Sequence, residues 1–170
     1  MRNVLRWMLL AACVLTGCAQ PTPVGPAAPV PLIDESGLNQ LLAQSAGKVL
    51  LVDFWATWCQ PCRALFPHTV ALQRELADRG LVVITVALDD SDQTGEVQDF
   101  LRAQGARSYD FMSRYGNGSE SAAKFDIDGG AIPHVRLYDR RGRLREKFGY
   151  GNPPDPSRID EAVKALLAEN

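Results

Sequence analysis

Several features that mark other protein classes are scarce in this sequence. Its 170 residues include only 4 cysteines and 2 histidines, and the formal net charge at pH 7 is -2. Without a positive excess, the chain lacks the basic face that a nucleic-acid partner would need. The apolar run at residues 7–15 is too short to span a membrane as a permanent helix. No internal repeat is found, and the length suits one domain with appendages.

The start of the chain has the pattern of an export signal. Arg2 and Arg6 precede the apolar run, and LTGC at residues 15–18 follows it. This segment resembles a bacterial lipobox, in which cleavage occurs before the cysteine and the cysteine is then acylated. An ordinary secretory signal with a chance cysteine is the alternative. We therefore expect a signal peptide at residues 1–17 and a lipid on Cys18, whose acyl chains would hold the protein at a membrane.

The same signal sets the expected location. Export would place the mature chain outside the cytosol, where disulfides persist. Ala19, not aspartate, follows Cys18, which by resemblance to enterobacterial sorting favours the outer membrane. Residues 19–31, AQPTPVGPAAPVP, hold five prolines and no charge, the composition of an extended tether. We expect the lipidated tether to occupy residues 18–33 and a domain at residues 34–170 to face the periplasm of a cell envelope.

Processing would leave Cys59 and Cys62 as the free thiols of the mature chain. Cys13 would leave with the signal peptide, and Cys18 would carry the lipid. One close pair is not the framework of bridges that staples small secreted domains. A bridge that closes so short a loop also removes little entropy from the unfolded chain, which argues against a purely structural role.

Metal binding is another common use of two cysteines separated by two residues. A four-coordinate zinc site needs two more ligands, usually a second such pair or two histidines. His68 and His134 are far apart in the sequence, so zinc is disfavoured. Soft thiolates also suit Cu(I), for which His134 could lie near the cysteines in the fold. We expect no metal, and keep a copper-binding, redox-sensing module as the alternative function.

Apolar runs and turn residues predict alternating strands and helices. Residues 48–55, KVLLVDFW, and 81–88, LVVITVAL, read as strands covered on both faces. Further strands are expected at residues 109–112, 132–138 and 143–150. Helices are expected at residues 38–43, 59–79 with a kink at Pro67, 96–104, 119–125 and 157–167 with Ser157 as N-cap. This order predicts an α/β sandwich around a mixed central sheet.

Three motifs carry a more specific resemblance. VDFWATWCQPC at residues 52–62, Pro67, and GAIP at residues 130–133 together resemble thioredoxin. The export signal and the extra segment at about residues 90–128 are more similar to the membrane-anchored branch, the TlpA/ResA-type thiol–disulfide oxidoreductases. The resemblance covers roughly residues 38–167. It implies a thioredoxin-like three-layer sandwich, with a mixed central sheet flanked by helices.

The resemblance also implies an activity and its partners. Cys59 and Cys62 would form a redox-active disulfide, with no further cofactor. The substrates would be exported thiol or disulfide proteins, possibly apocytochrome c, and a membrane protein would donate electrons to a monomeric enzyme. Gln60-Pro61 resembles the Gly-Pro of reducing thioredoxins more than the Pro-His of strong oxidants. A thioredoxin-fold peroxidase is disfavoured, because its Pro-x-x-x-Thr-x-x-Cys pattern is absent before Cys59.

The spacing of the pair suits thiol–disulfide exchange. The reaction needs a thiolate, an accessible sulfur and a second thiol that resolves the mixed disulfide. Cys59 would precede the first turn of a helix, where unpaired N–H groups and the helix dipole stabilise negative charge. Pro61 has no N–H and suits that turn. We expect Cys59 to be the catalytic nucleophile and Cys62, one turn further and more buried, to be the resolving thiol.

Asp53 lies inside an apolar strand, six residues before the pair. Burial should raise its pKa, and by resemblance it would be a general acid and base for Cys62. A solvated residue at a strand end is the alternative. Thioredoxin has a lysine near this carboxylate, and our alignment puts Leu88 in its place. Asp89 or Asp90 could be the acidic residue that TlpA/ResA-type proteins often carry after the next strand.

The remaining candidates concern substrate binding. Ile132 and Pro133 match the family's cis-proline loop, which implies a cis bond and backbone groups free to pair with an extended substrate strand. Trp58 would belong to the docking surface, with Trp55 packed beneath the site. A cationic His134 that pointed toward the thiols would favour the thiolate, whereas a half-exposed strand histidine is the alternative.

Overall fold

The computed structural model describes residues 29–106, 108–149 and 152–169. The expected signal peptide at residues 1–17, the lipidation site Cys18 and the tether at residues 19–28 lie outside the described residues. In the described part of the chain, a six-stranded mixed sheet has the order β1-β4-β3-β2-β5-β6. Its strands are β1 (Leu32–Ile33), β2 (Val49–Trp55), β3 (Leu81–Ala87), β4 (Tyr109–Ser113), β5 (His134–Tyr138) and β6 (Leu144–Phe148).

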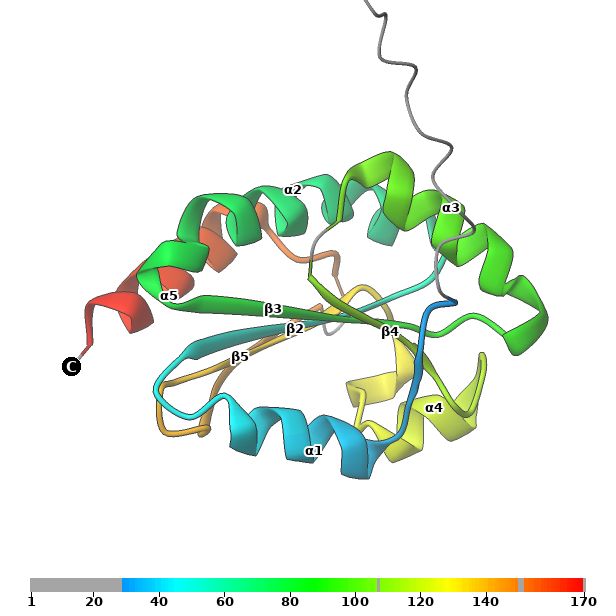
Figure 1. Ribbon diagram of the computed structural model, residues 1–170, viewed down its shortest axis with the longest axis horizontal. Helices are drawn as coiled ribbons and strands as arrows, with labels where there is room; N and C mark the ends of the chain where they lie inside the picture. The colour runs from blue at the N-terminus through cyan, green and yellow to red at the C-terminus, as the bar shows by residue number, and fades with distance from the viewer. Residues whose placement is uncertain (1–28, 107, 150–151, 170) are drawn as a thin grey trace, which may run out of the picture.

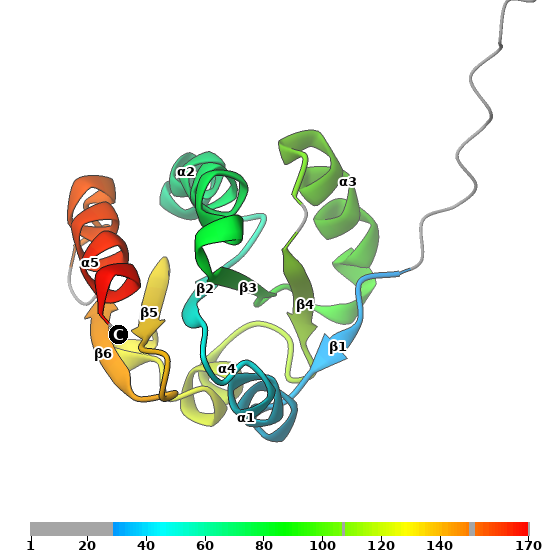
Figure 2. The ribbon, with the colours of Figure 1, turned by 60° about the vertical axis from the view of Figure 1, so that its left-hand side comes forward.

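Helices cover both faces of this sheet. One layer contains α2 (Gln60–Leu76), α3 (Thr94–Gln104) and α5 (Pro156–Ala168), and the other contains α1 (Glu35–Gln44) and α4 (Ser119–Lys124) (Figures 1 and 2). The three-layer architecture expected from the sequence is therefore confirmed. None of the helices in the described ranges is both long and apolar enough to cross a membrane.

Strand β2 lies at the centre of the sheet and is buried along its whole length. Side chains alternate between the two faces, since successive residues of a strand point in opposite directions. Val49 and Leu51 pack with residues of α2 and α5, whereas Leu50, Val52 and Phe54 pack with the layer of α1. Cover on both faces explains why the strand reads as a continuous apolar run.

Capping residues and glycines set the ends of the two long helices near the site. Helix α2 begins after its N-cap Cys59, with Pro61 in the first turn, and continues through Pro67. A short 3-10 turn, Ala77–Arg79, follows it and ends at Gly80 in the left-handed region, with φ of 100°. Helix α3 ends in the same way at Gly105, as expected.

Some boundaries differ from those expected. Leu32 and Ile33 pair with β4, so the folded part begins before the expected tether ends. The last helix begins at Pro156, and Asp155, not Ser157, is its N-cap, because the Asp155 carboxylate accepts the Ser157 N–H at 2.9 Å. Strand β5 begins at His134, two residues later than expected.

Candidate active site

Cys59 and Cys62 lie where the chain passes from β2 into α2. The two cysteines form a disulfide, with their Cα atoms 5.3 Å apart. The Cys59 sulfur also accepts the backbone N–H of Cys62 at 3.2 Å. A sulfur at the N-cap faces the unpaired N–H groups of the helix, where a negative charge is stabilised. The structure therefore confirms that Cys59 precedes the first turn of the helix and that Cys62 lies within it.

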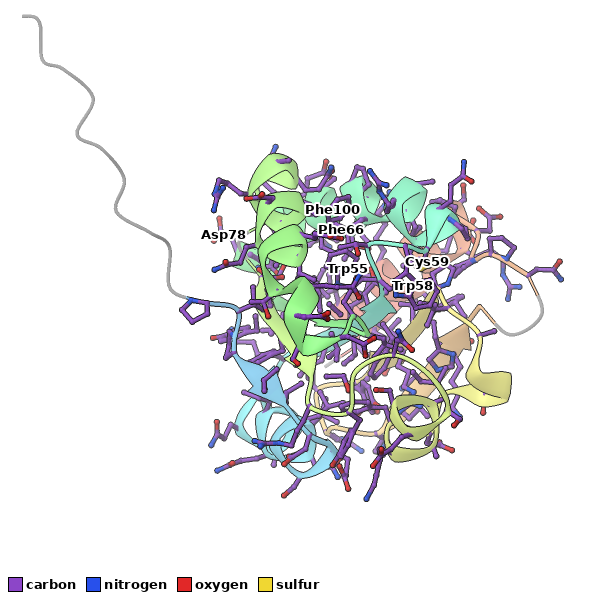
Figure 3. All side chains as sticks on the ribbon, turned by 90° about the vertical axis from the view of Figure 1, so that its right-hand side faces the viewer. Trp55, Trp58, Cys59, Phe66, Asp78 and Phe100 are labelled. Carbon is purple, nitrogen blue, oxygen red and sulfur yellow. A yellow bond between two sulfur atoms is a disulfide. The ribbon has the colours of Figure 1, made fainter. Side chains whose placement is uncertain are left out.

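Cys62 is the more buried of the two cysteines, as expected. Cys62 is 1% exposed and Cys59 is 6% exposed, so both are largely covered. The expectation of an openly accessible first sulfur is therefore corrected: in the disulfide form it lies in an apolar cluster with Ile132 packed against it. The neighbouring Trp58 is 55% exposed and marks the outer surface of the site (Figure 3).

The Ile132–Pro133 peptide bond is cis, as the resemblance implied. The carbonyl oxygen of Ile132 lies 3.7 Å from the Cys59 sulfur. Gly149 follows β6 and lies against this loop. The approach is so close that a Cβ at this position would overlap the Pro133 carbonyl oxygen. The loop is therefore held directly beside the disulfide.

Aromatic side chains form the floor of the site. The Trp55 ring lies 4.6 Å from that of Phe66 on α2 and 4.9 Å from that of Phe100 on α3, centroid to centroid. Figure 3 shows the three rings near α3, beside Trp58 and Cys59. Trp55 is buried, as expected, and contributes packing between the sheet and both helices.

Asp53 is buried beneath α2, so the solvated alternative is wrong. The Thr69 hydroxyl of α2 donates to its Oδ2 at 2.8 Å, and its Oδ1 has no hydrogen-bond partner among the described residues. Burial raises the pKa of the Asp53 carboxyl to about 6, against the opposing effect of the Thr69 hydrogen bond. A carboxyl of this kind can hold or release a proton near neutral pH.

The residue beside Asp53 on the next strand is Thr85, so our alignment of Leu88 with this position is wrong. Leu88 packs in the cluster on the opposite face of the sheet. The Thr85 hydroxyl donates to Asp110 of β4 at 2.7 Å, and burial raises the pKa of Asp110. Asp53 therefore has an uncharged neighbour at this position in place of a lysine.

Asp89 fixes the loop that leads to Cys59. Its carboxylate accepts the backbone N–H of Thr57 at 3.1 Å and also the Thr57 hydroxyl. Burial raises the pKa of Asp89, although the bonds from Thr57 oppose this. Asp90 instead caps the 3-10 turn Ser91–Gln93 and accepts from Asn117. Of the two acidic candidates after β3, Asp89 is the one that touches the segment before the disulfide.

His134 is buried, and both readings of it from the sequence are wrong. Its ring packs against Phe54, on the face of the sheet opposite Asp53, and its Nε2 accepts from Arg136. Burial, with the nearby Arg136 cation, lowers the pKa of His134 to about 4. A neutral ring with these contacts does not supply the cation that would favour the thiolate. No group of three or more Cys, His, Asp or Glu suited to a metal occurs in the ranges described.

Sequence reasoning missed Thr57, Thr69 and Arg136. The two threonines carry no pattern of their own, although each lies at a fixed distance from the cysteine motif. Arg136 could have been noticed as a lone charge within an apolar strand. Its burial depends on groups that α4 brings to it, which the sequence alone does not reveal.

Comparison with known proteins gives consistent matches. The family model described as Redoxin matches residues 22–166. The thiol-disulfide oxidoreductase ResA of Oceanobacillus iheyensis is 35% identical over 60 residues, which are 35% of this chain and 30% of that protein. The thiol:disulfide interchange protein HelX of Rhodobacter capsulatus is 28% identical over 124 residues, 72% of this chain and 62% of that protein.

A solved structure is similar over most of the chain. It is a thiol:disulfide interchange protein of the thioredoxin family from Chlorobium tepidum, 28% identical, with a TM-score of 0.61. The match covers 84% of this chain and 99% of that one. By contrast, the chain spans only 30% to 62% of the length of the two curated relatives above.

Proposed function

The chain belongs to the redoxin family and has a thioredoxin-like fold, and on this basis we propose that it is a thiol–disulfide oxidoreductase. One observation carries the proposal. Cys59 is the N-cap of a long helix that contains Cys62, and the Cys59 sulfur lies 3.7 Å from the backbone carbonyl oxygen of Ile132. An extended substrate that paired with this loop would bring its own sulfur to Cys59.

The reaction proceeds in two exchanges. The Cys59 thiolate attacks one sulfur of a substrate disulfide, which forms a mixed disulfide and releases the other substrate sulfur as a thiolate. Cys62 then loses its proton and attacks the Cys59 sulfur. The second substrate thiol leaves, and the Cys59–Cys62 disulfide forms. The substrate gains two electrons, and the cysteine pair loses two.

Asp53 is the proposed acceptor of the Cys62 proton. It hydrogen-bonds to Thr69, two turns further along the helix that carries Cys62. With a pKa of about 6, the carboxylate is available above that pH and can take up a proton when a thiol ionises nearby. Trp58, Ile132 and Pro133 form the proposed substrate-binding surface.

The location and the partners are also proposals. The sequence pattern before Cys18 supports a lipid anchor there, with residues 18–31 as a tether and the domain facing the periplasm, at the outer membrane. Exported proteins, possibly apocytochrome c, are the proposed substrates, and a membrane protein is the proposed electron donor. Labelling with a tagged fatty acid tests the anchor: incorporation should disappear in Cys18→Ala, and incorporation that persists would contradict it.

We propose that the enzyme works as a reductant. Gln60-Pro61 supports this direction through its similarity to the dipeptide of reducing thioredoxins. The test is equilibration of the Cys59–Cys62 pair with glutathione buffers. A reduction potential nearer to about -270 mV, as for thioredoxin, is expected, and a value near about -120 mV would contradict the proposal.

Insulin reduction tests the activity itself. The reduced protein should precipitate the insulin B chain in the presence of dithiothreitol, faster than dithiothreitol alone. Cys59→Ser should abolish the acceleration. An equal rate with and without the wild-type protein would contradict the proposed function.

A further inference from the structure

Arg136 is a buried arginine on β5, three residues after the cis proline. Its guanidinium lies 5.3 Å from the centroid of the Phe54 ring on β2. A buried cation is costly unless its donors are satisfied. The groups that satisfy this one lie at two places in the chain that flank the cis-proline loop.

The first place is the end of α4. Nη2 of Arg136 donates to the carbonyl oxygens of Phe125 and Asp126. Asp126 is in the left-handed region, with φ of 51°, and the Ile127 N–H returns to the Ala122 carbonyl at 2.8 Å. This geometry ends the helix, and the carbonyls of the C-cap Phe125 and of Asp126 lie beyond its last turn. Arg136 is the cation that satisfies both of them.

The second place is the start of β5. Nε of Arg136 donates to Nε2 of His134 at 3.2 Å, and His134 directly follows Pro133. The neutral ring accepts this bond, which a protonated imidazole could not do. One guanidinium thus touches residues 125, 126 and 134, the two ends of a ten-residue segment. We call residues 125–134 the Pro133 segment.

Apolar contacts also hold the Pro133 segment, since Phe125 and Ile127 are buried in the cluster that contains Phe54. His134 pairs with Phe54 in the sheet, and Arg136 adds the polar link between the two ends.

The Pro133 segment contains Gly129 and Gly130, both with positive φ, and residues 128–130 form a short 3-10 turn. Lys147 of β6 pairs with Asp126 and Asp128 at 3.5 and 3.1 Å. These pairs are exposed, and such pairs contribute little because water and salt screen them.

We propose that Arg136 is a positioning residue for substrate binding, one that fixes both ends of the Pro133 segment and so holds the Ile132 backbone beside the Cys59 sulfur. The proposal rests on the proposed thiol–disulfide exchange. It concerns docking and not the chemistry at sulfur. Arg136 lies on the face of the sheet opposite Asp53 and α2, and it contacts His134, the end of α4 and the Phe54 ring.

Two disulfides separate docking from chemistry. A fluorescence-quenched peptide disulfide needs the loop, whereas 5,5′-dithiobis(2-nitrobenzoate) reacts at an accessible thiolate without peptide pairing. In Arg136→Met, the half-saturating concentration of the peptide should rise by about tenfold with little change in the maximal rate. The rate with the small disulfide should stay within about twofold of wild type. Equal losses with both disulfides, or no change with the peptide, would overturn the proposal.

Arg140→Met is the matched control. Arg140 lies four residues further on and also donates to backbone carbonyls, those of Gly47, Leu167 and Glu169. It acts at the end of α5, away from the Cys59 end of the molecule (Figures 1 and 3). Its loss should lower Tm without changing the half-saturating peptide concentration. A rise equal to that of Arg136→Met would mean that general destabilisation explains the effect.

Arg136→Lys covers the case in which the methionine variant does not fold. Lysine keeps the charge but cannot bond both ends of the Pro133 segment at once. Amide exchange at Ile127 and Gly130 should accelerate by about tenfold in this variant, while exchange at Gly142 stays as in wild type. Unchanged exchange at these amides would overturn the proposal. If the wild type reduces neither disulfide, the proposed function fails, and the exchange experiment still decides the role of Arg136.

Discussion

Two buried aspartates, one on β2 and one just after the neighbouring strand β5, have opposite electrostatic surroundings. Asp53 on β2 has one hydrogen-bond partner and no cation in contact among the described residues, and burial raises its pKa. Asp139 follows β5 at the other end of the sheet and accepts from Arg143, which lowers its pKa. Arg145 and the backbone N–H groups of residues 141 and 143 also contact it.

This difference distinguishes the active-site end of the molecule, near Asp53, from a structural end, near Asp139. At the Asp139 end, the bonds from Arg143, Arg145 and the backbone favour the ionised carboxylate and tie the β5–β6 turn together. At the Asp53 end, the carboxyl stays poorly solvated, so its proton affinity suits exchange with a thiol near neutral pH. The predictions below alter one end at a time.

Asp53→Asn should have the largest effect. The ordinary pKa of 3.8 rises to about 6 in the folded protein, so stability falls as pH rises between these values and the cost is complete above about 6. The amide cannot ionise, so urea unfolding at pH 8 should show a gain of about 3 kcal/mol, with no gain at pH 3. Insulin reduction should slow by about 100-fold. An equal stability change at both pH values would contradict this account of Asp53.

Gly149→Ala, at the active-site end, should lower stability more than Gly142→Ala, at the structural end. Both glycines have positive φ, 107° and 73°, which disfavours alanine. A Cβ at Gly149 also overlaps the Pro133 carbonyl, whereas the space at Gly142 is open. Thermal unfolding should show losses of about 3 and about 1 kcal/mol, respectively. Insulin reduction should weaken only in Gly149→Ala, and equal activity of the two variants would count against the close approach at Pro133.

Asp139→Asn should act in the opposite direction to Asp53→Asn. The lowered pKa means that Asp139 stabilises the folded state above its ordinary value of 3.8, and that this contribution is lost as pH falls below it. The variant should therefore lose about 5 °C of Tm at pH 7 and a smaller amount at pH 2. Its rate of insulin reduction should match wild type. A slower rate would show that the two ends are not independent.

Thr69→Val should have the smallest effect and sharpen the contrast. It removes the hydrogen bond from Thr69 to Asp53 and leaves the volume of the side chain nearly unchanged. We expect a loss of about 1 kcal/mol at pH 8 and a further rise in the pKa of Asp53. Infrared titration of the Asp53 carboxyl measures that rise directly, and a fall would contradict the role given to Thr69.

Most of the fold could be predicted because its central strands are buried on both faces. The runs at residues 48–55 and 81–88 differ from β2 and β3 by only one residue at an end. Strand β1 was missed because Leu32 and Ile33 are too short a run to show a period next to a proline-rich stretch. The prediction of Ser157 as N-cap overlooks Asp155, which is an equally good capping residue and precedes Pro156, a residue that suits the first helical position.

The site could be predicted where a motif fixes local geometry, and less well where it depends on neighbouring strands. The placement of Cys59 and Cys62 at the start of a helix followed from local sequence, and the cis bond before Pro133 followed from the resemblance to thioredoxin. The neighbour of Asp53 did not, because strand register decides that it is Thr85. The burial of His134 and Arg136 could not be predicted from local sequence either. It depends on their contact with each other, on the end of α4 and on the Phe54 ring.

The central claim is that Cys59 attacks the substrate and Cys62 resolves the mixed disulfide. Trapping tests it most directly: Cys62→Ala and Cys59→Ala are each expressed in the native envelope, and captured proteins are identified after non-reducing electrophoresis. Cys62→Ala should accumulate mixed disulfides, because the attack occurs and the resolution does not. Cys59→Ala should accumulate none. Capture by Cys59→Ala and not by Cys62→Ala would reverse the two roles and contradict the account.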